Sequence, residues 1–219
     1  MINAIIFDMD GLMVDTEPLS QQAWQMAIRP FGHTLDDATY QRMVGLRSDQ
    51  SIQIVLQTFD LPLTAAELYA QKNEHYRQLR AEGIPVMPGL WALLEAIESR
   101  RLPWGVATSS SRAQAEEVLT RLGLAERCHA LAAGNEVAHG KPAPDIYLLA
   151  AQRLNVLPDR CLALEDSLPG SQAALAAGMI TVVVPNGRSP ADFPHAHHIL
   201  PSLHEVIPLL TDEKSLTSA

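Results

Sequence analysis

Close to its N-terminus the chain reads Ala4-Ile5-Ile6-Phe7-Asp8-Met9-Asp10-Gly11. Four apolar residues in a row are typical of a strand that is covered on both faces, as in a parallel sheet flanked by helices. Two carboxylates follow at the end of this strand, where open α/β sheets bind their ligands. Carboxylates so close together repel each other unless a cation or a shared proton relieves the repulsion. The pattern predicts an α/β fold with a functional site at Asp8 and Asp10; an acidic pair in a solvated turn is the alternative.

Similar apolar runs recur along the chain and alternate with amphipathic stretches. The runs predict four more strands, at residues 104–107, 130–132, 161–164 and 180–184. The amphipathic stretches between them predict helices at residues 90–99, 112–122, 144–153 and 170–177. Strands that alternate with helices indicate a doubly wound, Rossmann-like parallel sheet.

One interval departs from this alternation. Residues 14–83 contain no β-like run, but they contain amphipathic stretches at 19–28, 49–59 and 65–80. A helical block between the first two strands is best interpreted as an inserted α-helical cap, because α/β enzymes place lids at the ends of strands. We therefore expect a catalytic core made of residues 1–13 and 84–219 and a helical cap made of residues 14–83.

Composition and charge disfavour several classes of protein. Of 219 residues, 47% are hydrophobic and 19% are charged, which is typical of a globular chain. The net charge is −9, and no cluster of basic residues offers a surface for nucleic acid or for a membrane. No apolar run approaches the roughly 20 residues of a membrane span, and the N-terminus lacks the basic region of a signal peptide. With only two cysteines, we expect a cytoplasmic monomer with reduced thiols.

Three further groups of polar residues follow predicted strands or lie in the loops after them. Thr108 and Ser109 follow the second strand, Lys141 lies in a turn stiffened by prolines, and Glu165-Asp166 follows the strand at 161–164. Taken alone, Glu165-Asp166 could simply stabilise the N-terminus of the helix that follows, and Lys141 could be an exposed surface lysine. Together with Asp8 and Asp10, these groups form the set that phosphoryl transfer through an aspartyl phosphate requires, and Mg²⁺ prefers such oxygen ligands.

In this order the motifs resemble those of the haloacid dehalogenase superfamily, in its branch of phosphohydrolases with a helical cap. Asp8-Met9-Asp10-Gly11 resembles the first motif, Thr108 the second, Lys141 the third and Glu165-Asp166 the fourth. The resemblance covers nearly the whole chain, and it implies an α/β core with a cap.

The resemblance also implies a role for each motif residue. Asp8 would be the nucleophile that attacks phosphorus, and Asp10 the general acid that protonates the leaving alcohol and then the base that activates water. Thr108, with its neighbour Ser109, and Lys141 would hold the phosphoryl oxygens.

For the metal, the resemblance implies Mg²⁺ bound by Asp8, by the backbone carbonyl of Asp10 and by Asp166. Glu165 would be a further ligand or a partner of the ligands.

The residues expected to choose the substrate lie in the cap. Glu17 belongs to an Asp-Thr-Glu triplet that resembles the hinge of sugar-phosphate phosphatases, and Arg47 to a loop that resembles their specificity loop. There Arg47 would meet a sugar hydroxyl or a second anion. Lys72 begins a stretch that resembles a cap helix of β-phosphoglucomutase, but Ser20 stands where that mutase has a histidine, and the loop arginine falls one residue early.

These residues predict a Mg²⁺-dependent phosphomonoesterase that acts on a small phosphorylated metabolite, a hexose or pentose phosphate, through an aspartyl phosphate. A β-phosphoglucomutase that interconverts β-glucose 1-phosphate and glucose 6-phosphate is the alternative. The two departures in the cap disfavour it, because a mutase must hold a bisphosphate. A non-catalytic binding scaffold is the third possibility, and it would have lost at least one motif residue, whereas all are present.

Overall fold

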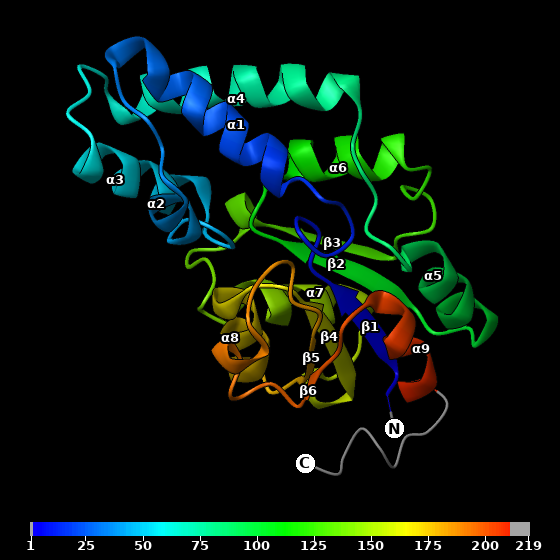
Figure 1. Ribbon diagram of the computed structural model, residues 1–219. Coiled ribbons are helices and arrows are strands. Elements are labelled where there is room, and N and C mark those ends of the chain that lie inside the picture. The colour runs from blue at the N-terminus through cyan, green and yellow to red at the C-terminus, as the bar shows by residue number, and fades with distance from the viewer. Residues whose placement is uncertain (1, 211–219) are drawn as a thin grey trace.

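A six-stranded parallel sheet forms the centre of the computed structural model, which describes residues 2–210 (Figure 1). Its strands lie in the order β3-β2-β1-β4-β5-β6, the arrangement of a doubly wound sheet. They are β1 (Ala4–Phe7), β2 (Trp104–Thr108), β3 (Ala130–Ala133), β4 (Cys161–Glu165), β5 (Ile180–Val183) and β6 (His198–Ile199). The predicted α/β class and the five predicted strands are confirmed. The pattern missed β6, because two residues that begin with a histidine give no apolar run.

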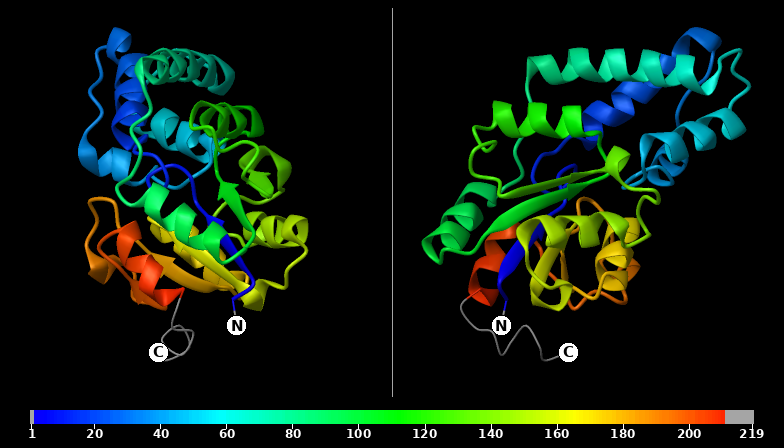
Figure 2. Two further views of the ribbon diagram at one scale, coloured as in Figure 1. Left: turned by 90° about the vertical axis from the view of Figure 1, so that its right-hand side faces the viewer. Right: turned by 180° about the vertical axis from the view of Figure 1, so that it is seen from behind.

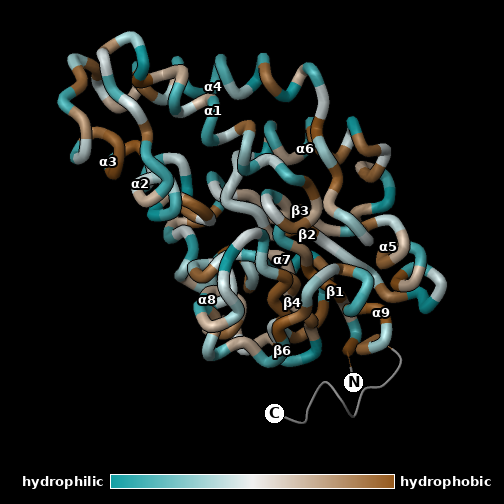
Figure 3. The backbone as a smooth tube through the Cα atoms, viewed as in Figure 1, coloured by the Kyte–Doolittle hydropathy of each residue, from teal (hydrophilic) through white to brown (hydrophobic). Residues whose placement is uncertain are grey.

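Helices cover both faces of the sheet (Figures 1 and 2). They are α5 (Leu90–Ser99), α6 (Arg112–Arg121), α7 (Asp145–Leu154), α8 (Leu168–Ala176) and α9 (Val206–Leu209). Alternate residues of β1 point to opposite faces: Ile5 and Phe7 pack in the layer of α5, α6 and α9, and Ile6 packs in the layer of α7 and α8. Both faces are thus buried, which explains the continuous apolar runs; in Figure 3 the hydrophobic segments gather in these central strands.

Four helices follow β1 and precede α5. They are α1 (Glu17–Ile28), α2 (Asp37–Gln41), α3 (Ser48–Thr58) and α4 (Ala65–Glu82). They lie together on one side of the sheet (Figure 1) and share a hydrophobic cluster of their own, which includes Trp24, Val55 and Leu68. The two chain segments that lead into and out of this block lie together, because Val14 bridges Val86. The boundaries of core and cap stay a prediction, and "cap" below means residues 14–83.

Short 3₁₀ helices complete the described chain, at Arg29–Phe31, Gly134–Glu136, Pro158–Arg160, Pro190–Asp192 and Leu203–Glu205. Among residues 2–210, none of the helices has the length and apolar character that a membrane crossing requires.

Candidate active site

The motif residues meet at the carboxyl ends of three neighbouring strands. Asp8 directly follows β1, Thr108 is the last residue of β2, and Glu165 is the last residue of β4. Because β1 pairs with β2 on one side and with β4 on the other, parallel pairing brings residues from distant parts of the sequence to one edge. The turn after β1 also depends on Gly11, whose φ is +92° and whose hypothetical Cβ would overlap the carboxylate of Asp166.

Lys141 lies buried between two carboxylates. Its Nζ is 2.5 Å from Oδ1 of Asp8 and 2.5 Å from Oε1 of Glu165, and the side chain is only 1% exposed. Burial opposes the charged form of Lys141, but the two carboxylates outweigh it and raise its pKa above the usual value. The interpretation of Lys141 as a surface lysine is therefore wrong.

Glu165 has hydrogen-bond donors on both carboxylate oxygens. Besides Lys141, Oε1 accepts from the hydroxyl of Tyr147 at 2.7 Å. Oε2 accepts from the backbone N–H of Asp166 at 3.1 Å and from the backbone N–H and hydroxyl of Ser167 at 3.2 and 3.0 Å. Tyr147 was not predicted, since a tyrosine in an amphipathic helix gives no sign of a buried carboxylate beside it.

The acidic residues form a buried cluster that suits a divalent cation. One carboxylate oxygen from each of Asp8, Glu165 and Asp166 lies within 4.8 Å of the others, and Oδ1 of Asp166 is buried without a hydrogen-bond partner in the described chain. Burial raises the pKa of Asp8 to about 8 despite Lys141, and raises that of Asp166 well above its usual range. When all three are ionised, the carboxylates exceed the single ammonium by two negative charges, which a hard divalent ion with oxygen ligands would neutralise.

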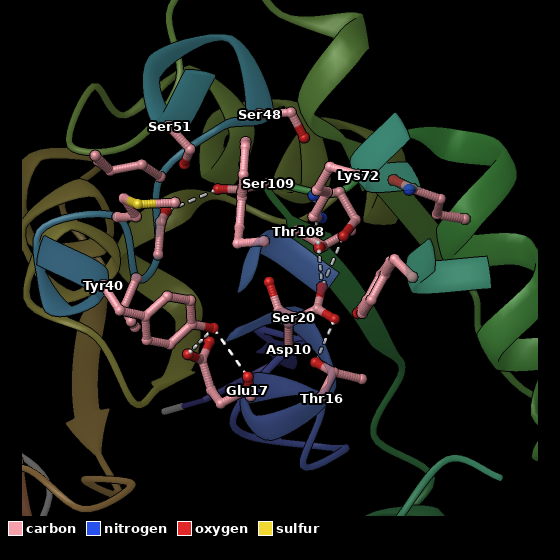
Figure 4. Close-up of a pocket in the computed structure, with 18 of the residues that line it drawn as sticks. Asp10, Thr16, Glu17, Ser20, Tyr40, Ser48, Ser51, Lys72, Thr108 and Ser109 are labelled. Atoms are coloured by element: carbon pink, nitrogen blue, oxygen red, sulfur yellow. Dashed lines mark hydrogen bonds between the residues drawn. The ribbon is translucent and has the colours of Figure 1, made fainter. Parts of the chain in front are cut away.

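Asp10 is held by hydroxyl groups at the floor of a pocket (Figure 4). Its Oδ1 accepts from Thr16 at 2.7 Å, and its Oδ2 accepts from Ser110 at 2.8 Å and from Thr108 at 3.3 Å. The sequence analysis named Ser109 and not Ser110, because the sequence does not show which of three successive serines contacts Asp10. These contacts fix the direction of the Asp10 carboxylate.

Two predicted cap residues, Glu17 and Lys72, line the same pocket. The hydroxyl of Tyr40 lies 2.8 Å from Oε2 of Glu17, and burial raises the pKa of Glu17 to about 7. Lys72 is 7% exposed, and its Nζ lies 4.3 Å from the ring centre of Tyr76 and 5.5 Å from that of Trp24. Burial lowers the pKa of Lys72 to about 8.

Arg47, by contrast, is not among the residues that line this pocket. Its guanidinium binds the carboxylate of Asp49 and donates from Nη1 to the backbone carbonyls of Val137 and Ala138, at 3.1 and 3.3 Å. Arg47 thus joins the start of α3 to the loop after β3, and its contact with substrate stays a prediction.

Ser109 lines the pocket, but its hydroxyl donates to the backbone carbonyl of Gly45 at 3.0 Å and so joins the cap to the core. Gly45 has φ +80°, and a Cβ added there would lie 2.6 Å from Oγ and 2.9 Å from Cβ of Ser167. The cap loop can therefore lie this close to the core only because residue 45 has no side chain.

Gly45→Ala should lower kcat/KM by about tenfold or more, because the new methyl group displaces a loop that lines the pocket. Gly32→Ala is the matched control: Gly32 has φ +83°, but nothing lies within 4 Å of its hypothetical Cβ. Both variants should lose about 1 kcal/mol of stability to backbone strain. Steady-state kinetics and thermal melts would test this, and equal activity in the two variants would contradict it.

Comparison with known proteins agrees with this geometry. Residues 2–178 match the family model described as haloacid dehalogenase-like hydrolase. The chain is 32% identical to a phosphorylated carbohydrates phosphatase of Thermotoga maritima, over 81% of this chain and 82% of that protein. It is 36% identical to the fructose-1-phosphate phosphatase YqaB of Escherichia coli, over 82% and 95%.

A solved structure shows the same fold. The β-phosphoglucomutase of Clostridium difficile superposes with a TM-score of 0.87 at 26% identity, over 98% of this chain and 97% of that one. The similar proteins thus include phosphatases as well as a mutase.

Proposed function

The chain belongs to the haloacid dehalogenase-like hydrolase family, and from this premise we propose that it is a Mg²⁺-dependent phosphomonoesterase acting on a small sugar phosphate. The observation that carries the proposal is the position of Lys141. Its ammonium lies 2.5 Å from Oδ1 of Asp8 and stabilises the ionised form of this carboxylate, which is the form that attacks phosphorus. Asp10, held by hydroxyl groups, lines the same pocket as Asp8, and we assign it as the proton donor.

In the first step, an Asp8 oxygen attacks phosphorus, the ester P–O bond breaks, and Asp10 gives its proton to the leaving oxygen. In the second step, Asp10 takes a proton from water, whose oxygen attacks the phosphorus. The bond between Asp8 and phosphorus breaks, and inorganic phosphate leaves. Thr108 and Lys141 stabilise the phosphoryl oxygens during both steps.

The metal would be held by Asp8, Asp166 and the backbone carbonyl of Asp10. The free Oδ1 of Asp166 supports this assignment. We place Glu165 beside the ligands rather than among them, because both of its oxygens already accept hydrogen bonds. Bound there, Mg²⁺ supplies positive charge against the phosphoryl oxygens.

Release of inorganic phosphate from a panel of sugar monophosphates tests the proposal. We expect release with Mg²⁺, loss of release after chelation with EDTA, and recovery when Mg²⁺ is added in excess, because two buried negative charges otherwise stay uncompensated. A control with EDTA already saturated by Mg²⁺ should keep full activity.

Two outcomes would contradict the proposal. One is phosphate release that chelation does not affect. The other is steady conversion of β-glucose 1-phosphate to glucose 6-phosphate, with a bisphosphate primer and without free phosphate, which would establish a mutase instead.

A further inference from the structure

The cap side of the pocket is electrically balanced. Glu17 and Lys72 are the only charged residues that the described cap contributes to its lining, one acidic and one basic. The other charged residues of the lining, Asp8 and Asp10, belong to the end of β1, where the phosphoryl group reacts. A leaving group held against the cap therefore meets one charge of each sign.

Lys72 is the only one of these cap charges that lacks a polar partner in the described chain. Its ammonium lies over the rings of Tyr76 and Trp24, and among residues 2–210 it has no ion pair and no hydrogen bond. An aromatic face offers no lone pair to an N–H donor comparable to that of an oxygen. The donors of Lys72 are available to one oxygen-bearing ligand.

Tyr40 holds the side chain of Glu17 in place. The hydroxyl of Tyr40 lies 2.8 Å from Oε2 and 3.0 Å from the backbone oxygen of Glu17 (Figure 4). The carboxylate keeps lone pairs that accept from a ligand hydroxyl, and it repels an anion.

The arginines around the pocket are already bound to protein groups. Arg47 donates to carbonyl oxygens of the core, and Arg80 binds Glu117 on α6. Arg188 donates to the carbonyl of Gln41 and lines a second pocket, whose lining also includes Glu17. A second phosphate or a carboxylate on the leaving group would thus find Lys72 alone, with Glu17 opposing it.

Neutral groups complete the cap side of the lining, and they include the apolar side chains of Met43, Val44 and Leu46. The hydroxyls of Ser20, Ser48 and Ser51 lie on the cap side, as do the rings of Trp24 and Tyr76. Hydroxyls exchange hydrogen bonds with ligand hydroxyls, and aromatic faces pack against C–H groups. This surface matches a polyol rather than an anion.

We propose that the substrate is the monophosphate of a neutral, hydroxyl-bearing carbon skeleton, and that Glu17, positioned by Tyr40, excludes leaving groups with a second anionic group. The inference rests on the proposed phosphatase function and narrows its substrate class.

The test compares two pairs of esters that differ by one anionic group. They are glycerol 3-phosphate against 3-phosphoglycerate, and fructose 1-phosphate against fructose 1,6-bisphosphate. At pH 8, above the pKa of about 7 of Glu17, the kcat/KM of the wild type should favour the neutral member of each pair by about tenfold or more, as expected for one charge repulsion within a pocket. Parity, or preference for the anionic member, would overturn the inference without any variant.

Glu17→Gln should shrink this preference about tenfold, because the amide keeps the shape and removes the charge. Glu116→Gln is the matched control, since it removes an exposed charge on α6 that pairs with Arg112 and should leave the preference unchanged. Tyr40→Phe should lower kcat/KM for both members of a pair, because it removes the hydrogen bond that positions the Glu17 carboxylate.

Equal ratios in Glu17→Gln and the wild type would sink the inference while leaving the phosphatase function intact. Unchanged kcat/KM for both members of a pair in Tyr40→Phe would contradict the positioning of Glu17 by Tyr40. No phosphate release from any of the four esters by the wild type would overturn both proposals.

Discussion

Asp8→Asn is expected to abolish phosphate release, with kcat lowered about 10⁴-fold or more, while the protein stays folded. An amide oxygen does not form a stable bond to phosphorus, so the covalent step is lost even if substrate binds. The fold should tolerate the change, because an Asn carbonyl still accepts from Lys141. Burial and the nearby Glu165 both disfavour the Asp8 carboxylate and contribute to raising its pKa to about 8, so a neutral amide at this position removes an unfavourable charge.

Phosphate release and thermal melts measured on the same sample would check both parts of this prediction. Asp159→Asn is the matched control, since Asp159 is exposed and lies at the opposite end of β4 from Glu165, and it should keep full activity. Retention of more than about 1% of kcat in Asp8→Asn would contradict the assignment of the nucleophile.

The sequence predicted the parts of the fold that depend on long patterns. Five strands and seven helices were recognisable because burial on one or both faces forces an apolar run or a helical period. The elements it missed, α2, β6 and α9, have five residues or fewer, too few to repeat a period. Tertiary contacts decide whether such short segments become helix or strand.

For the site, the sequence predicted the residue types but not their partners. The order of the motifs predicts that Lys141 lies with Asp8 and Glu165. The hydrogen bond from Tyr147 to Glu165 depends on how α7 packs on the sheet, which the sequence does not show. The direction of Arg47 is the clearest example. Its position in a loop that resembles the specificity loop of sugar-phosphate phosphatases predicts a substrate contact. In the structure its Nη1 donates to two core carbonyls, and its Nε and Nη2 donate to Asp49.

Substitution by methionine should change the stability of the fold in opposite directions at two buried lysines. Lys141→Met should lower the free energy of unfolding by about 3–5 kcal/mol, because it leaves the carboxylates of Asp8 and Glu165 buried without their cation. Lys72→Met should instead raise it by about 1–2 kcal/mol. A pKa lowered to about 8 corresponds to a cost of about 3 kcal/mol for burying the ammonium, of which the contacts with Tyr76 and Trp24 offset part.

The pH dependence gives the sign of the Lys72 effect independently. At pH 7 the folded and unfolded chains both carry the charge, so the wild type bears the full cost. As the pH rises above about 8, the folded chain releases this proton while the unfolded chain still binds it up to its usual pKa of 10.5. The advantage of Lys72→Met should therefore shrink between pH 8 and 10.5.

Denaturant unfolding of the wild type and the two variants at pH 7 and pH 10 would measure these differences, and phosphate release would follow activity. We expect both variants to lose activity, since one lysine holds the nucleophile and the other faces the leaving group. Equal destabilisation by both substitutions would show that Lys72 has a polar partner in solution. If Lys72→Met gains stability and loses activity, the fold keeps the Lys72 ammonium unpaired at a cost in stability. The reason would be that the substrate, and not the protein, provides the acceptor for this ammonium.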